Sequence, residues 1–282
     1  MTGPDARGVL HPQNAAGRFT LDRRPPDPAL ARLVEFYWHV RWDLRGQPAY
    51  EQKVLAHPNI HLVFEEPYAA VYGVDRGLFV RRLEGTGQVL GVKFRPGGFR
   101  PLWGRPVQEL VDRVLPATEL FGPAVEETSR RILALADPAA MAALADAFLL
   151  DRFPSADVQA SDERASDEQA SNEQRPGPQA ALAAAMVETA TGDHTLLRVE
   201  QLAERHGVSV RTLQRLFAEY VGVGPKWVLR RARLHEAAQR AAEDSAVDWS
   251  SLATDLGYAD QSHLTRDFTA VVGQPPSRYV QR

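Results

Sequence analysis

The C-terminal third of the chain carries the same pattern of apolar and polar positions twice. The first copy extends from Leu202 to Pro225 and the second from Leu252 to Pro276. Each has a Leu-Ala pair, a glycine, a short polar residue, apolar residues at spacings of three and four, and a final Gly-x-x-Pro. Residues before the turn lie 50 positions from their counterparts, and those after it lie 51 positions away. One residue has therefore been added in the turn of the second copy, and the remainder keeps its register.

Each copy predicts a helix-turn-helix. The glycine, Gly207 or Gly257, can adopt the left-handed conformation that ends a helix, and Ser209 or Asp260 can cap the next one. Apolar residues of that next helix, such as Phe217, would pack on the first helix and leave the polar residues outside. Arginine and glutamine are suited to bidentate contacts with guanine and adenine in the major groove. We therefore expect DNA contacts from Arg211, Thr212, Gln214 and Arg215 in the first copy and from Gln261, Ser262, His263, Thr265 and Arg266 in the second.

Two other interpretations of these hairpins stay open. They could be core elements with solvated polar faces, or they could form a protein-interaction module. Two copies in register favour a functional duplication over a chance resemblance. Charge gives the alternatives some weight, because the whole chain carries −3 and residues 179–282 contain 12 basic and 12 acidic residues. Attraction to DNA would then depend on basic side chains gathered on one face.

A long helix is predicted between the two copies. Apolar residues at spacings of three and four, from Trp227 to Ala241, follow a proline and meet no helix breaker. A helix of about twenty residues is about 30 Å long, close to the ~34 Å between successive major-groove faces. We expect it to hold two DNA readers at a fixed separation. Arg230, Arg231 and Arg233 at its start could contact phosphates, and a solvated charged face is the alternative.

The first half of the chain contains short strands followed by helices. Pro28–Trp42 has apolar residues at helical spacing before aromatic and β-branched ones, which predicts a helix that runs into a strand. Short runs bounded by Gly, Pro or acidic residues predict strands at 61–64, 69–73 and 89–94. Later apolar spacings predict helices at 120–136 and 141–153.

A polar, acidic segment separates the two halves. Three near-repeats of five residues occupy 160–174, and residues 154–178 carry six acids against two arginines, a charge of −4. Such a segment cannot bury enough apolar surface to offset the entropy of ordering, so we expect a disordered, flexible tether, with a transient helix as the alternative. The predicted organisation is a sensing or dimerising domain at 1–153, a linker at 154–178 and a DNA-binding domain at 179–282.

The second copy carries a specific motif. Ala253 is followed by Leu-Gly-Tyr, then by Gln-Ser-His, and then by an Arg-x-Phe that ends at Phe268. Together with 199–225, this motif resembles the tandem helix-turn-helix DNA-binding domain of the AraC/XylS family of bacterial transcription regulators. The resemblance implies seven helices, two three-helix lobes joined by a long helix, and base contacts at positions 211, 214 and 215. It also implies double-stranded DNA and RNA polymerase as partners.

The stretch Gly91–Leu102 is the distinctive part of the first half, with a strand followed by Arg-Pro-Gly-Gly. With a Trp-containing run at 34–38 and a His-Pro-containing run at 57–64, it resembles the small β-barrel, cupin-like sensor domains of one group of AraC-like regulators. The implied fold class is α+β, with such a domain before an all-α reader. The turn could bring backbone N–H groups close to a ligand, a purely structural turn being the favoured alternative.

This resemblance leads us to expect a small-molecule effector and a homodimer. The residues proposed to line the ligand site are Trp38, His57, His61, Phe94 and Arg95. For the aromatic residues among them, a place in the core is the favoured alternative.

His57 and His61 raise the question of a metal site. With Glu65 they share residue types with the metal-binding strands of cupins, and in a strand all three would point to one side. Pro58 interrupts a regular strand, however, and the cupin pattern places its two histidines one residue apart. We therefore expect no metal and no cofactor, and a cupin-like metal-dependent enzyme fused to a reader is the alternative. The sequence lacks the Gly-x-Ser-x-Gly motif, the phosphate loop and the dinucleotide-binding motif, so we expect the protein not to be an enzyme.

The composition is that of a soluble protein with room for two domains, with 282 residues, 44% apolar and 24% charged. The absence of cysteine excludes disulfides and thiolate chemistry. The sequence has no apolar run of 18 residues, and Met1–Asp5 begins no signal peptide. We therefore expect a cytoplasmic location and no membrane contact.

Overall fold

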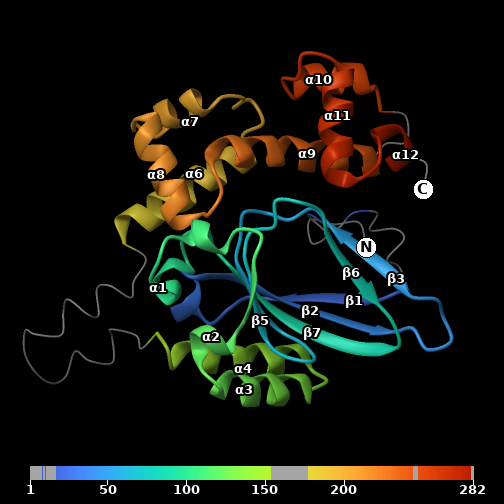
Figure 1. Ribbon diagram of the computed structural model, residues 1–282, viewed down its shortest axis with the longest axis vertical. Helices are drawn as coiled ribbons and strands as arrows, with labels where there is room; N and C mark the ends of the chain where they lie inside the picture. Colours follow the sequence, from blue (N-terminus) through green and yellow to red (C-terminus); the bar gives the residue numbers. More distant parts are fainter. Residues whose placement is uncertain (1–7, 9, 11–16, 154–176, 244–246, 281–282) are drawn as a thin grey trace, which may run out of the picture.

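The computed structural model describes residues 8, 10, 17–153, 177–243 and 247–280, which form an N-terminal β-rich domain and a C-terminal helical domain (Figure 1). The segment predicted to be a disordered linker lies, from 154 to 176, outside the described residues. The C-terminal helices lie on one side of the β-rich domain. On the opposite side lie α2 (Thr118–Phe121), α3 (Ala124–Leu133) and α4 (Pro138–Leu150), which correspond to the two helical stretches predicted after the strands.

A six-stranded antiparallel sheet forms the centre of the N-terminal domain. Its order is β1-β2-β7-β4-β5-β8, and β3 and β6 form a separate two-stranded sheet. The strands are β1 (Thr20–Arg24), β2 (Val34–Asp43), β3 (Tyr50–Val54), β4 (His61–Phe64), β5 (Ala70–Tyr72), β6 (Phe79–Leu83), β7 (Thr86–Phe94) and β8 (Val114–Pro116). The predicted strands at 61–64, 69–73 and 89–94 are confirmed as β4, β5 and part of β7. The domain has the expected β-rich character, but it consists of two open sheets and is not a closed barrel.

The helix predicted across Pro28–Trp42 is wrong beyond its first turn. A 3-10 helix, η3, occupies only Pro28–Leu30, and β2 begins at Val34. This strand pairs with β1 on one side and with β7 on the other. A β-bulge between Val34 and Phe36 adds one residue to β2, so Val34 and Tyr37 point to the same buried face although they are three residues apart. Their spacing was therefore indistinguishable from that of a helix.

The C-terminal domain has the architecture that the resemblance implies. Its helices are α6 (Pro178–Gly192), α7 (Val199–Arg205), α8 (Val210–Tyr220), α9 (Pro225–Glu243), α10 (Trp249–Asp255), α11 (Gln261–Val272) and α12 (Pro276–Val280). Figure 1 shows α9 crossing from the first lobe, with α7 and α8, to the second, with α10 and α11. Both turn glycines have positive φ, 64° at Gly207 and 69° at Gly257. Ser209 caps α8 and Asp260 caps α11, so the predicted ends of these helices are confirmed.

Two apolar cores connect the domains unequally. The larger core is continuous from the N-terminal domain, with Phe64 and Phe94, into the first lobe, with Phe217. The smaller core belongs mainly to the second lobe, around Phe268, and the N-terminal domain adds Leu55 to it. The first lobe thus shares more buried apolar surface with the N-terminal domain than the second lobe does. Over the described ranges, the structure has no helix long and apolar enough to cross a membrane.

Candidate nucleic-acid interface and adjoining cavity

In the first lobe, α8 presents a polar face to solvent. Its apolar residues, such as Phe217, are buried, whereas Arg211, Gln214 and Arg215 are exposed. Thr212 is partly buried, and its N–H donates to the Ser209 hydroxyl at 3.1 Å. The structure therefore brings three of the four predicted contact residues onto one open surface, and it places Thr212 beside the cap.

In the second lobe, α11 is arranged in the same way. Leu264, Phe268 and Val272 are buried, and Thr265 is partly buried. The remaining predicted contact residues are exposed; they are Gln261, Ser262, His263 and Arg266. The two outward faces differ chemically, since two arginines and a glutamine dominate the first and mixed polar residues the second.

Arg230 lies in an ion pair that sequence reasoning missed. Its guanidinium donates two hydrogen bonds to Asp267 of α11, both at 2.8 Å. The Tyr258 hydroxyl donates to the same carboxylate at 3.2 Å. Burial raises the pKa of Tyr258, so it stays protonated as a donor. Arg230 thus joins α9 to α11. Asp267 lies 37 residues further along the chain, so no local sequence pattern indicates this contact.

The neighbouring arginines of α9 also face protein. Arg231 is 3% exposed and donates to the backbone carbonyls of Arg76, at 2.6 Å, and Gly77 in the N-terminal domain. Arg233 lies over the Tyr258 ring, 4.8 Å from its centroid. The hypothesis that Arg231 contacts phosphate is therefore wrong, because the N-terminal domain covers its side chain.

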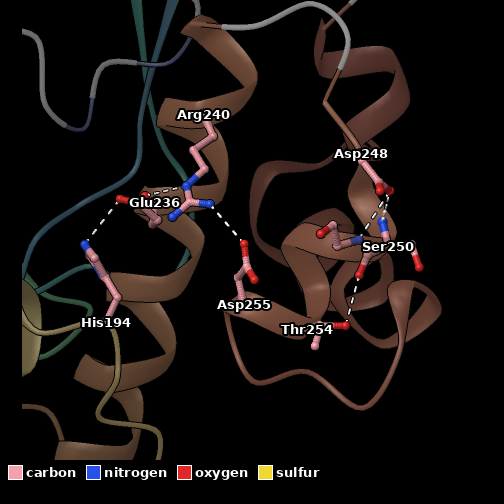
Figure 2. Close-up of polar contacts among 8 residues, drawn as sticks. His194, Glu236, Arg240, Asp248, Ser250, Thr254 and Asp255 are labelled. Carbon is pink, nitrogen blue, oxygen red and sulfur yellow. Dashed lines mark hydrogen bonds and ion pairs between the residues drawn. The ribbon is translucent and has the colours of Figure 1, made fainter.

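Further along α9, polar contacts join the helix to α10 and to the loop that follows α6. Figure 2 shows Arg240 between Glu236 and Asp255, with distances of 2.7 and 3.4 Å, and His194 on the other side of Glu236 at 3.3 Å. Asp248 accepts from the backbone N–H of Ser250 and caps α10. Of these contacts, the Arg240–Asp255 pair joins α9 to α10, and it is weak because its side chains are 44% and 55% exposed.

A cavity of about 2110 Å³ extends from the β-rich domain to the helical domain. Of the predicted ligand residues, Trp38, His57, His61 and Arg95 line it. Phe94 instead lies in the core, with its ring 4.9 Å from that of Phe99. The preceding residue in β7, Lys93, points the other way and lines the cavity, as alternation along a strand requires.

The histidines of the cavity are engaged separately. Trp38 Nε1 donates to His61 Nδ1 at 3.1 Å. The ring of His57 stacks on that of His235 from α9, with centroids 4.0 Å apart and planes 7° apart. Glu65 instead accepts from Tyr72 and pairs with Arg81. His57, His61 and Glu65 therefore do not converge, and the part of the chain that the structure describes has no group of three His, Asp or Glu residues suited to a metal.

Acidification should destabilise the folded chain through these histidines. The pKa of His235 is lowered from 6.5 to about 3, chiefly by burial and then by the charge of Arg231. Burial also lowers the pKa of His61 to about 3 and that of His57 well below its usual value. Below pH 6.5 the unfolded chain takes up protons that the folded chain does not, so the free energy of unfolding decreases as the pH falls towards 3. Each such histidine adds a slope of about 1.4 kcal/mol per pH unit.

Urea denaturation at a series of pH values between those two limits measures this slope. The variant His235→Phe should lose about one histidine's share of it, because the ring no longer titrates in the unfolded chain. An unchanged slope would mean that His235 is already protonated in the folded chain, contrary to its buried position.

Comparisons with known proteins agree with this arrangement. Residues 202–282 match the family model described as a helix-turn-helix domain, and residues 22–116 match a domain of unknown function, DUF6597. A Streptomyces lividans protein named as an AraC-like transcription regulator is 38% identical over 81 residues, 29% of this chain and 26% of that protein. The HTH-type transcriptional regulator RipA of Corynebacterium glutamicum is 37% identical over 106 residues, 37% of this chain and 31% of RipA. The chain thus spans a third or less of each of these relatives.

Among solved structures, apo ToxT from Vibrio cholerae has a TM-score of 0.40 at 10% identity, covering 92% of this chain and 99% of ToxT. ToxT with bound unsaturated fatty acid has a TM-score of 0.34 at 10% identity, covering 97% of this chain and 92% of ToxT.

Proposed function

We propose that this chain, whose C-terminal domain is a helix-turn-helix domain of the AraC type, is a sequence-specific DNA-binding transcription regulator. The observation that carries the proposal is the pair of exposed polar faces on α8 and α11, set on opposite ends of α9. At 19 residues, α9 is about 28 Å long, close to the ~34 Å that separates successive major-groove faces. Each reading helix would then enter its own groove.

The target would be a long and asymmetric site. Arg211, Gln214 and Arg215 offer bidentate contacts to guanine and adenine, whereas α11 offers one arginine among shorter polar residues. The first lobe would therefore contribute more of the base reading. Since the whole domain has equal numbers of acidic and basic residues, attraction to phosphates would rest on these local arginines and not on net charge.

Selection from random-sequence duplexes at low salt tests the proposal. We expect the full chain to enrich a motif of two unequal parts, with centres about 10 base pairs apart. A protein-interaction module would instead retain no duplex even at low salt. Failure to retain DNA, or retention without an enriched motif, would contradict the proposed function.

The Arg230–Asp267 pair predicts a defect confined to one half of that motif. Arg230→Ala should lower stability by no more than about 1 kcal/mol, since the pair is partly exposed, but it should release α11 from α9. Footprinting on the selected duplex should then show weaker protection of the part read by the second lobe only.

Arg240→Ala is the matched control, because Arg240 also lies on α9 and pairs with a residue of the second lobe. It should leave both parts protected. If Arg230→Ala instead weakens binding evenly and reduces the salt slope by about one charge, then Arg230 contacts a phosphate, as its place in the sequence suggested.

The proposal has three further parts. They are a small-molecule effector in the cavity, homodimerisation, and contact with RNA polymerase. The cavity supports the effector, because it joins the predicted ligand residues to α9 of the reader. His235 Nε2 is buried at this cavity without a hydrogen-bond partner among the described residues. A ligand that offers a hydrogen-bonding group there would satisfy it. Ligands found by thermal shift should lose their effect in His235→Phe.

A further inference from the structure

The Arg-Pro-Gly-Gly segment forms a tight turn at the boundary between the domains. It follows β7, where the Arg95 N–H donates to Leu33 O and the Gly98 N–H donates to Arg95 O, both at 2.8 Å. The intervening Gly97 N–H is directed away from its own domain. It donates at 2.9 Å to the carbonyl of Tyr220, the last residue of α8.

The two consecutive glycines serve different packing contacts. A Cβ on Gly98 would lie 2.3 Å from Leu33 O, within the N-terminal domain. A Cβ on Gly97, which has a φ of +82°, would lie 3.0 Å from Ala180 O and 3.2 Å from Ala180 Cβ, in α6 of the reader. Gly98 therefore permits the domain to fold, and Gly97 permits the reader to approach it.

Two further contacts surround the same end of α8. The Arg100 guanidinium donates to Glu219 at 2.7 Å, and both side chains are about three-quarters buried, with exposures of 27% and 26%. On the other side, a Cβ on Gly222 would meet Val107 O at 3.2 Å, so the backbones approach closely there too. The last carbonyls of a helix lack partners within it and carry a partial negative charge. The Gly97 N–H and the Arg100 cation match both requirements.

Glu219 also belongs to the reading helix itself. It follows Arg211 and Arg215 at intervals of four residues and so continues their stripe along α8. The N-terminal domain holds the C-terminal end of this stripe, while Arg211 and Gln214 stay exposed at the other end. Docking therefore fixes the helix without covering the residues predicted to read bases.

We propose that the 95–100 segment is a docking surface for the C-terminal end of α8, and that through it the N-terminal domain sets the position of the first reading helix relative to the second. This proposal rests on the proposed DNA-binding function. The second reading helix, α11, is connected to the same N-terminal domain through α9. Asp267 of α11 pairs with Arg230 of α9, and the adjacent Arg231 donates to the backbone carbonyls at 76 and 77. The N-terminal domain thus fixes the positions of both α8 and α11.

Charge exchange in the full chain tests this docking. Arg100→Glu and Glu219→Arg should each undock α8, and the double variant should restore the pair with its polarity reversed. On the duplex selected by the wild-type chain, each single variant should bind about tenfold more weakly, a typical coupling free energy between sites, and should tolerate insertions between the two parts of the motif. Binding of Arg100→Glu to a duplex with only the first part should not change, because Arg100 lies outside the reading helix. Arg105→Glu is the control, since Arg105 pairs with Glu109 inside the N-terminal domain.

Three results would overturn the docking proposal while the wild-type chain still binds DNA. The single variants could keep wild-type affinity and spacing preference. Arg100→Glu could lose as much affinity for the single-part duplex as for the full one, or the double variant could fail to recover. An increase in affinity on undocking would also overturn it, because the contact would then be inhibitory. If the wild-type chain retains no duplex at all, the proposed function itself fails, and that outcome is separate from the other four.

Discussion

Replacing Arg215 with alanine should weaken binding to the selected duplex by about 1–3 kcal/mol and relax the preference at one base pair. Arg215 lies on the exposed face of α8, and among the described residues it makes one long hydrogen bond, of 3.4 Å, to Gln179, so its guanidinium is accessible to a base. Alanine removes both donors of a bidentate contact with guanine. Fluorescence anisotropy at fixed salt, on duplexes that differ at single base pairs, measures both effects.

Arg205→Ala is the matched control for Arg215→Ala. Arg205 is an exposed arginine of the same lobe, but it lies on α7 and pairs with Asp193 at 3.6 Å. Its removal should change neither affinity nor base preference appreciably. If Arg215→Ala weakened all duplexes equally, Arg215 would contact phosphate, and the assignment of α8 positions to bases would be wrong.

Replacing Phe217 with alanine should lower the free energy of unfolding by about 3–5 kcal/mol, because Phe217 is fully buried and alanine leaves a cavity. Phe268 is the equivalent residue of the second lobe and is equally buried. The two variants should nevertheless unfold differently. Phe217 belongs to the core that continues into the N-terminal domain, so its loss should destabilise both together. Phe268→Ala should produce an early transition confined to the second lobe.

Urea denaturation distinguishes these cases when helix content is followed by circular dichroism and the N-terminal domain by the fluorescence of Trp38, Trp42 and Trp103. Trp227 and Trp249, which lie in the C-terminal domain, are replaced with phenylalanine in every chain compared. Phe217→Ala should move both signals to lower urea, whereas Phe268→Ala should move only part of the helical signal. A single shared transition in both variants would contradict the unequal attachment of the two lobes. The leucine variants Phe217→Leu and Phe268→Leu should show the same pattern with smaller shifts.

The helical domain could be predicted from the sequence because its determinants are local. Glycines at positive φ, side-chain caps at Ser209 and Asp260, and apolar residues at helical spacing all act within a few residues. The duplication then showed that these signals formed a unit. The exposure of Arg211 and Arg215 follows from the same periodicity, whereas their contact with DNA stays a prediction.

The β-rich domain was predicted less completely because its contacts are distant. Sequence reasoning missed β1, β3, β6 and β8, and it took part of β2 for a helix. The Trp38–His61 contact joins β2 to β4, which are not adjacent in the sheet, and no local pattern shows this. The same limit applies to α9, where Arg231 reaches carbonyls more than 150 residues away, and to Arg230, whose partner lies 37 residues on.

The buried Arg231 limits the exchange of the C-terminal domain between this chain and other proteins. Its acceptors at 76 and 77 are backbone carbonyls, and burial lowers the pKa of its guanidinium to about 10 while leaving it charged at neutral pH. A chimera that joins this C-terminal domain to another N-terminal domain would keep the cation and lose the loop that accepts its hydrogen bonds. An unpaired buried charge is costly, so such a chimera would need an apolar residue at 231 or an equivalent loop in the new N-terminal domain. Changing the length of the connection between the domains would supply neither the apolar residue nor the loop. The contacts of α9 therefore restrict which N-terminal domains can be joined to this C-terminal domain.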